Sequence, residues 1–162
     1  MSYDIRIIDQ VTNESVMLEQ SHYIRGGTYA EGGTSELWFN ITYNYAPFYY
    51  RAETLGESTK EYGDEPVDGC LPVLREETGG IPGLAFLTIP QARERVLRAI
   101  NALRDEPLDA HGNPYKPVPL FDGGTLQDSN YWAPTERNAR RALLRLMEIL
   151  LLAPDNAIIE VS

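Results

Sequence analysis

Residues 26–45 read GGTYAEGGTSELWFNITYNY, and the rest of the chain can be interpreted outward from them. The glycine pairs allow positive φ without strain, so the first half of this stretch predicts tight turns. The second half is rich in aromatic and β-branched residues and predicts a strand over residues 36–41. Residues 43–52 favour a helix opened by Thr42 or Asn44, and a continued extended segment is the alternative.

The two ends of the chain predict strands. Residues 3–19 alternate apolar and polar side chains around a turn-like centre, which predicts a β-hairpin. Residues 156–161 predict a last strand that joins this hairpin. Between them, a capping box and helical spacing predict a helix over residues 89–104. A second long helix is predicted from Pro134 to about Leu152, and its wide apolar surface indicates burial in the domain or self-association.

Two segments rich in Gly and Pro, residues 53–87 and 105–131, interrupt the regular elements. Irregular connections of this length are typically either functional or disordered. The order of the elements predicts a single α+β domain over residues 1–162. We expect a mainly antiparallel sheet of about four to five strands with three helices packed on one face.

Composition excludes several classes of function. The net charge of -10 disfavours a generic nucleic-acid binder, which needs many Lys and Arg to neutralise phosphates. No run of about 18 apolar residues could span a bilayer, and charged residues interrupt the first twenty positions, so neither a membrane span nor a secretory segment is expected. Cys70 is the sole cysteine, which favours a reducing compartment. We therefore expect a cytoplasmic protein.

The glycine pairs form the first candidate site. Successive free backbone N–H groups make a concavity that binds anions, and neighbouring hydroxyls add donors. The alternative is that the pairs only make two tight turns, because the spacing matches no known nucleotide-binding fingerprint. The residues assigned to ligand binding in this part of the chain are Arg25, Gly26, Gly27, Thr28, Tyr29 and Thr34.

Polar residues alternate with aromatic ones in the next stretch. In an extended segment Asn40, Thr42 and Asn44 share a face, and their amides and hydroxyl can bind the polar edge of a ligand while a ring such as Tyr45 stacks on it. The alternative is helix capping and turn formation, which Asn and Thr also favour. All four residues are assigned to the candidate site.

A basic stripe marks the last predicted helix. Arg137, Arg141 and Arg145 recur every four residues and could clamp a phosphate or carboxylate group. The alternative is a solvated face that pairs with nearby acidic residues. We assign Arg137 and Arg141 to ligand binding.

The two histidines, His22 and His111, lack an evident nucleophile or orienting partner in the sequence. No Cys, His and Asp cluster has the spacing of a zinc site, and no calcium loop is present. We therefore assign no catalytic residue, no metal ligand and no cofactor.

Three motifs carry a resemblance: GGTY at residues 26–29, NITYNY at residues 40–45 and YWAPTERNA at residues 131–139. Together they resemble a group of short phage and prophage proteins that has no assigned activity. The resemblance implies an intracellular phage accessory protein, which acts by binding a host protein or a small signalling molecule of host defence.

These observations predict a non-enzymatic protein that binds a small, nucleotide-like anion, and the resemblance implies a role in counter-defence. One alternative is an interaction module that inhibits a host protein through its acidic loops or residues 105–131. A lower alternative is a hydrolase that uses His22 or His111.

Overall fold

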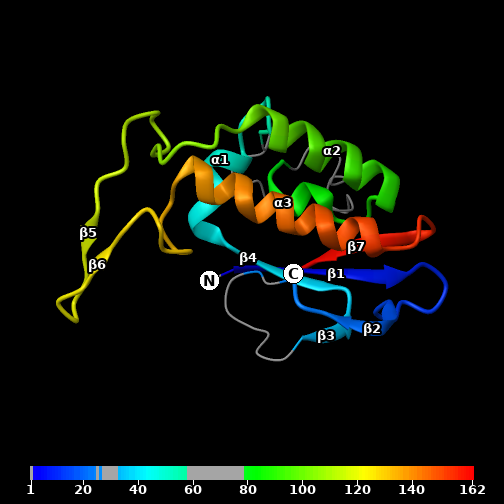
Figure 1. The fold of residues 1–162 in the computed structure, drawn as a ribbon. Coiled ribbons are helices and arrows are strands. Elements are labelled where there is room, and N and C mark those ends of the chain that lie inside the picture. Colours follow the sequence, from blue (N-terminus) through cyan, green and yellow to red (C-terminus); the bar gives the residue numbers. More distant parts are fainter. Residues whose placement is uncertain (1, 25, 27–32, 58–78) are drawn as a thin grey trace, which may run out of the picture.

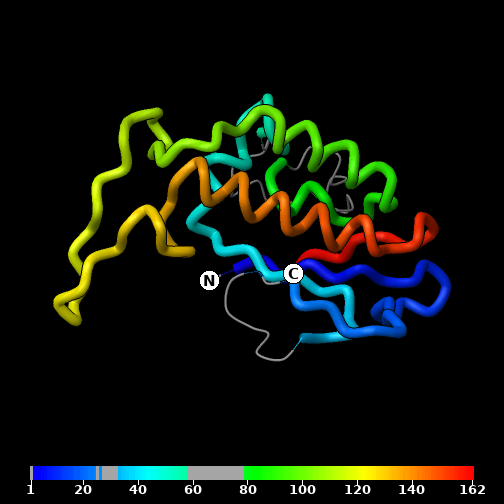
Figure 2. The backbone as a smooth tube through the Cα atoms, viewed as in Figure 1, coloured from blue at the N-terminus to red at the C-terminus, as the bar shows by residue number. Residues whose placement is uncertain are grey.

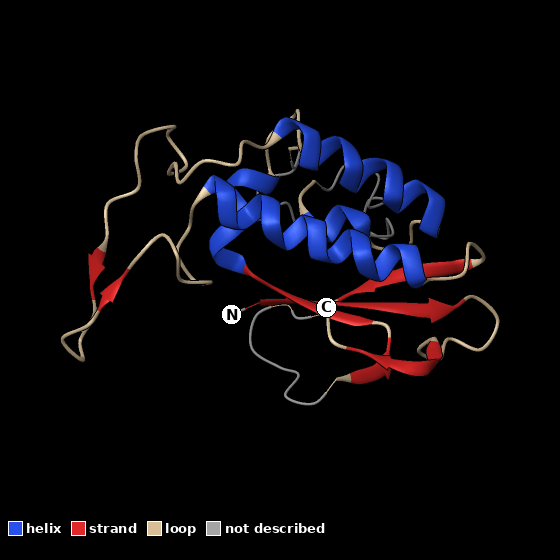
Figure 3. Ribbon diagram, viewed as in Figure 1, coloured by secondary structure: helices blue, strands red, loops and turns tan. Residues whose placement is uncertain are grey.

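The computed structural model describes residues 2–24, 26, 33–57 and 79–162 (Figure 1). The strands are β1 (Ser2–Asp9), β2 (Met17–His22), β3 (Thr34–Glu36), β4 (Trp38–Thr42), β5 (Val118–Pro119), β6 (Thr125–Leu126) and β7 (Ala157–Val161). The helices are α1 (Ala46–Tyr49), α2 (Ile89–Ala102) and α3 (Glu136–Leu152), with 3-10 turns η1 (Tyr43–Tyr45) and η3 (Ile81–Leu84). The α+β prediction is confirmed, with the helices gathered on one face of the main sheet (Figure 3).

The main sheet has three antiparallel strands in the order β4-β1-β7, so the predicted number of four to five strands is wrong. β1 is central because β4 and β7 both pair with it, and its residues Ile5, Ile7 and Ile8 are all buried. The remaining described strands form two separate pairs, β2 with β3 and β5 with β6. The expected last strand is present as β7, and it joins β1 as predicted.

The predicted hairpin over residues 3–19 is also wrong beyond its turn. Asp9 closes the turn by accepting backbone N–H bonds from Val11 and Thr12 at 2.8 and 3.0 Å. One bridge joins Ile8 to Ser15, but β2 then pairs with β3 instead of β1. The reason is that β4 and β7 already occupy the two edges of β1. In Figure 1, β2 and β3 lie on the side of the main sheet away from the helices.

Aromatic side chains from residues 43–52 fill the space between sheet and helices. This segment is helical, as favoured from the sequence, with Thr42 as the N-cap of η1. Tyr45, Phe48 and Tyr49 are fully buried. The Tyr49 hydroxyl donates to the carbonyl oxygen of Ala139 at 2.9 Å, which ties α1 to α3. Burying large rings together with a satisfied hydroxyl stabilises this layer strongly.

The ends of the long helices are closed by side chains. Thr88 and Gln91 form the predicted capping box at the start of α2. Thr135 caps α3 by accepting a bond from the backbone N–H of Asn138. At the other end of α3, the Arg93 guanidinium donates to the carbonyls of Leu150 and Ala153 at 3.0 and 2.9 Å. These contacts satisfy carbonyl groups that a helix end leaves unpaired.

Both outer strands of the main sheet have partners on the side away from β1. On β4, the Tyr131 hydroxyl contacts the backbone N–H of Thr42 at 3.3 Å and the carbonyl oxygen of Asn40 at 3.4 Å. On β7, the backbone of Ile159 exchanges hydrogen bonds with Phe86 and Leu87 at 2.8 and 3.0 Å. The Tyr131 side chain therefore borders the main sheet at β4, and loop backbone borders it at β7.

Residues 105–131 form an arm that leaves the body of the protein before returning to α3 (Figure 2). The arm is irregular, as predicted, apart from the short β5–β6 pair. Its base is fixed to the first turn of α3, where the backbone N–H groups of Glu136 and Arg137 donate to the carbonyls of Leu108 and Glu106 at 2.8 and 3.0 Å. The arm is therefore anchored at its root and projects from there.

Residues 58–78, within the irregular segment predicted over residues 53–87, lie outside the described residues. Its two ends meet, because the backbone N–H of Gly80 donates to the carbonyl of Gly56 at 3.1 Å. A Cβ atom on Gly79 would lie 1.9 Å from that same carbonyl oxygen, so only glycine permits this approach.

In the described part of the chain, every helix is too short or too polar to cross a membrane. The apolar surface of α3 is partly open, with Leu144, Leu151 and Leu152 at 39%, 65% and 45% exposure. Self-association through α3 stays a prediction.

Candidate functional site

A small polar pocket lies where η1, the loop before α3 and α3 meet. Its cavity volume is about 110 Å³. The residues that line it are Tyr45, Ser129, Tyr131, Asn138, Arg141, Ala142 and Arg145. Two of the sequence-predicted ligand-binding residues, Tyr45 and Arg141, therefore come together here.

Two tyrosines, Tyr45 and Tyr131, line this pocket. The Tyr45 hydroxyl donates to the backbone carbonyl of Tyr131, and the two rings meet edge to face with centroids 5.6 Å apart. The Tyr131 hydroxyl is bound in turn to the backbone of β4. Tyr131 is therefore fixed to the sheet, and Tyr45 is fixed to Tyr131.

Asn138 fixes the loop that carries Ser129 and Tyr131. Its Nδ2 lies 3.0, 2.9 and 3.0 Å from the carbonyl oxygens of Asp128, Asn130 and Ala133. Asn138 is itself 7% exposed, in the first turn of α3. One amide thus holds residues 128–133 against the helix and orders the pocket before any ligand arrives.

The arginines of the pocket differ from the others in the described chain. Every other arginine that the structure describes donates to, or pairs with, an acceptor in the protein. Within the described residues, Arg141 and Arg145 make no hydrogen bond or ion pair. They lie four residues apart on α3, so their side chains share one face of the helix.

The tyrosines do not neutralise this positive charge. Burial raises the pKa of Tyr131 above its usual value, although the hydrogen bond to Thr42 and the charge of Arg145 oppose the shift. Burial, reinforced by the neighbouring Tyr131, likewise raises the pKa of Tyr45. Both phenols are therefore neutral near pH 7, and the lining residues that the structure describes carry two positive charges with no carboxylate among them.

The size of the pocket limits what can enter it. Sites that enclose a whole drug-sized ligand usually measure roughly 300–1,000 Å³. A volume of about 110 Å³ has room for a phosphate or carboxylate group and its hydrogen bonds, and not for a sugar or base as well. The guanidinium fork matches both of these oxyanions. The arrangement can therefore bind the charged group of a larger molecule.

The remaining predicted residues are placed elsewhere or lie outside the described chain. Arg25, Gly27, Thr28 and Tyr29 are outside the described residues. Gly26 lies against β4, where an added Cβ atom would be 1.9 Å from the backbone oxygen of Asn40. Thr34 lies in β3, and its hydroxyl accepts from the backbone N–H of Glu36 at 3.1 Å. Gly26 and Thr34 therefore have structural contacts, and neither lines the pocket.

The polar residues around β4 do not share one surface. Asn40 is 3% exposed, and its Nδ2 donates to Ser2 and Asp4, both at 2.7 Å. The buried Thr42 hydroxyl caps η1. Asn44 is exposed, and its side chain donates to the carbonyl of Trp132 at 2.8 Å. Only Asn44 therefore presents its amide to solvent beside the loop that forms the pocket.

Arg137 does not line the pocket, and it forms ion pairs instead. Its Nε lies 3.4 Å from the Asp105 carboxylate and its Nη1 lies 3.9 Å from that of Asp128. The next arginine along the stripe, Arg145, lines the pocket although it was not assigned to it. Its position four residues beyond Arg141 was the signal in the sequence. Ser129 gave no signal of its own.

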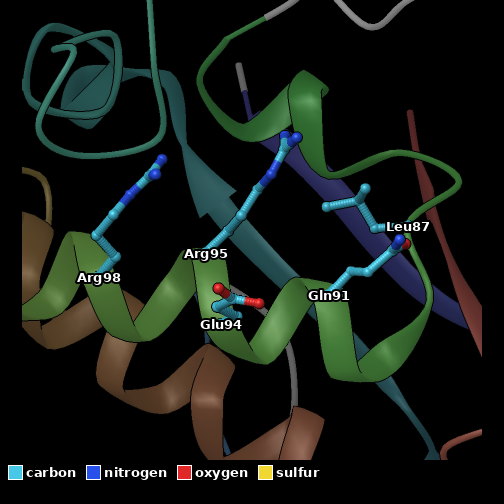
Figure 4. Close-up of a pocket in the computed structure, with 5 residues that line it drawn as sticks. All are labelled: Leu87, Gln91, Glu94, Arg95 and Arg98. Carbon is cyan, nitrogen blue, oxygen red and sulfur yellow. The ribbon is translucent and has the colours of Figure 1, made fainter.

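A second hollow of about 290 Å³ lies along α2 and is lined by Leu87, Gln91, Glu94, Arg95 and Arg98 (Figure 4). Arg95 and Arg98 extend away from α2 and donate to the carbonyls of Gly83 and Thr54 at 3.3 and 3.4 Å. These two arginines brace neighbouring loops, and Glu94 adds a negative charge. This hollow is therefore less suited to an anion than the pocket on α3.

Neither histidine is poised for acid–base catalysis. His22 is 8% exposed, with Nε2 2.7 Å from the carbonyl of Glu36 and Nδ1 accepting from the backbone N–H of Ile24 at 3.3 Å. Both of its ring nitrogens are therefore occupied. His111 lies in an exposed turn of the arm. Among the described residues, no group of three or more His, Cys, Asp and Glu side chains could hold a metal ion.

Comparisons with protein-family models, with characterised proteins and with solved structures find no match to this chain.

Proposed function

We propose that this protein binds a small anionic molecule, whose charged group enters the pocket between η1 and α3. The observation that carries the proposal is the pair Arg141 and Arg145, which line the pocket and have no partner among the described residues. In a chain with a net charge of -10, acidic side chains are plentiful, yet none of those that the structure describes pairs with these two. An external anion would supply the missing partner.

The neighbouring groups support this assignment. The Ser129 hydroxyl can donate to an oxyanion, and Asn138 holds the loop that carries it. Because the tyrosines are held to the backbone, the pocket has little conformational entropy to lose on binding. The described lining residues contain no base beside a nucleophile, so we propose recognition without catalysis.

The first test is titration with inorganic phosphate and with pyrophosphate, at constant ionic strength. At ten times its dissociation constant, a bound ligand adds about 1.4 kcal/mol to the free energy of unfolding. For a chain of this length, that corresponds to a rise of roughly 3–6 °C in the melting temperature. We expect such a rise with at least one of the two anions.

The matched variants remove the same charge at different places on α3. Replacing both Arg141 and Arg145 by Gln is expected to abolish the shift. Arg140→Gln is the control, because Arg140 donates to the carbonyl of Ile100 at 3.3 Å and does not line the pocket. An unchanged shift in the double variant, or the absence of any shift in the wild type, would refute the proposal.

The biological setting that we propose rests on the resemblance of the sequence motifs to phage and prophage proteins. We propose that the anion is a small signalling molecule of host defence, which the protein sequesters in the host cytoplasm. Expression in infected cells should then lower the free concentration of that molecule, and the variant lacking Arg141 and Arg145 should not.

A second candidate function, docking to a host protein, is favoured by the arm. Phe121 is 114% exposed at its tip, and Leu120 beside it is 43% exposed. The turn is ordered by its own bonds, with the backbone N–H of Leu120 donating to the carbonyl of Gly124 at 2.8 Å. A partner retained by the wild type and by Val11→Ser, but lost with Phe121→Ser, would support this function. If the wild type and both variants retained the partner equally, the arm would be excluded as the docking surface.

A further inference from the structure

We propose that the bound anion is the phosphate of a nucleotide, and that the aromatic base of this ligand stacks on Trp132. This inference rests on the proposed function, because the phosphate must first occupy the pocket beside Arg141 and Arg145. It adds the chemical class of the ligand and a residue, Trp132, that was not assigned to the site.

The volume of the pocket requires that most of such a ligand lie outside it. About 110 Å³ accepts the phosphate group, so the sugar and base must lie on the surface near the opening. The preference of the protein for one phosphate-containing ligand over another would then depend on the protein surface that the base contacts. Tyr131 and Trp132 connect these two regions, because Tyr131 lines the pocket and Trp132 follows it directly.

The Trp132 ring is placed to receive a base. It is 37% exposed, although it packs against Tyr131 with ring centroids 5.0 Å apart. The two planes meet at 88°, so Tyr131 covers at most one face of the indole. An indole face open to solvent is a platform on which any base can stack.

Asn44 fixes the backbone of Trp132. The Asn44 Nδ2 donates to the Trp132 carbonyl at 2.8 Å, which holds the segment against η1. The Oδ1 atom of the same amide accepts no hydrogen bond from any residue in the described chain. It can therefore accept one from an N–H group on the edge of a base stacked beside it.

The experiment compares adenosine 5′-monophosphate, ribose 5-phosphate and inorganic phosphate by calorimetry. Stacking of one base contributes enough for a difference of about tenfold or more in affinity. We expect adenosine 5′-monophosphate to bind at least about tenfold more tightly than ribose 5-phosphate. Trp132→Ala should remove that difference and leave the affinity for inorganic phosphate unchanged.

Because Trp132→Ala could fold poorly, a second measurement uses the fluorescence of Trp132 itself. In a Trp38→Phe background Trp132 is the sole tryptophan, and stacking should quench its fluorescence with adenosine 5′-monophosphate but not with ribose 5-phosphate. Equal affinities for the two ligands, with binding that still needs Arg141 and Arg145, would overturn the nucleotide inference alone. Failure of all three ligands to bind would overturn the proposed function as well.

Discussion

Replacing Glu136 tests how the body, the arm and α3 are held together. Glu136 lies in the first turn of α3 with its side chain 1% exposed. Its Oε1 accepts from Arg51 at 3.3 Å and from the backbone N–H of Arg104 at 3.2 Å, and its Oε2 is 3.5 Å from the Arg104 guanidinium. Arg51 also reaches the carbonyl of Ala110 in the arm at 3.4 Å. The carboxylate thus joins α3 to Arg51 and Arg104, and Arg51 in turn connects it to the arm.

The stability that Glu136→Ala is expected to lose depends on which charged side chains are left without a partner. Removing one member of a buried ion pair costs about 3–5 kcal/mol. The side chains of Arg51 and Arg104 are 24% and 59% exposed, so water can partly solvate both after the change. We therefore expect Glu136→Ala to cost about 3 kcal/mol, at the lower end of that range. In a chain of this length the melting temperature would fall by roughly 6–12 °C.

Urea denaturation of the wild type, Glu136→Ala and Glu136→Gln measures these costs. The Gln side chain keeps an oxygen for the Arg104 backbone N–H and loses only the charge, so it should cost about half as much as Ala. Combining Glu136→Ala with Arg51→Ala should cost less than the sum of the two single changes, because each removes the same contact. A cost below about 1 kcal/mol for Glu136→Ala would refute this account.

Three further predictions concern the core, the loop before α3 and the glycine stretch. Burial holds the pKa of the Tyr49 hydroxyl well above 10.0. Above about pH 10 the unfolded chain therefore loses this proton before the folded chain does, and the free energy of unfolding falls as pH rises. Tyr49→Phe should lose stability less steeply with pH than the wild type, and an equal slope for the two proteins would contradict this prediction. Asn138→Ala should cost about 2–3 kcal/mol and speed amide exchange at Ala133, and unchanged exchange would speak against its role. Gly26→Ala should cost about 1–3 kcal/mol in a thermal melt, because its Cβ would overlap the backbone oxygen of Asn40, whereas an equal melting temperature would exclude that close approach.

Local signals in the sequence were sufficient for the elements whose ends depend on nearby residues. Thr88 and Gln91 are three residues apart, and they form the capping box that starts α2. Local signals did not predict which strands pair with each other in the sheet. Whether β1 pairs with β2, β4 or β7 depends on competition between segments far apart in the chain, and the sequence of β1 alone does not rank them.

The candidate site was predictable in part for the same reason. Tyr45 and Arg141 were assigned from residue type and spacing, and both line the pocket. Arg137 has the same spacing as Arg141, but Asp105 and Asp128 from the arm lie beside it. That contact depends on how the arm returns to α3. Its irregular course, rich in Pro and Gly, leaves no periodic pattern from which to infer it.

The partners on the outer strands of the main sheet have a consequence for behaviour at high concentration. An open strand is a template on which a strand from another molecule can add, and repeated addition grows fibrils. Here the Tyr131 hydroxyl meets β4 and the backbone of residues 86–88 meets β7. Replacing Tyr131 by Phe would uncover polar backbone on β4, so this variant should bind amyloid dyes sooner than the wild type during prolonged storage.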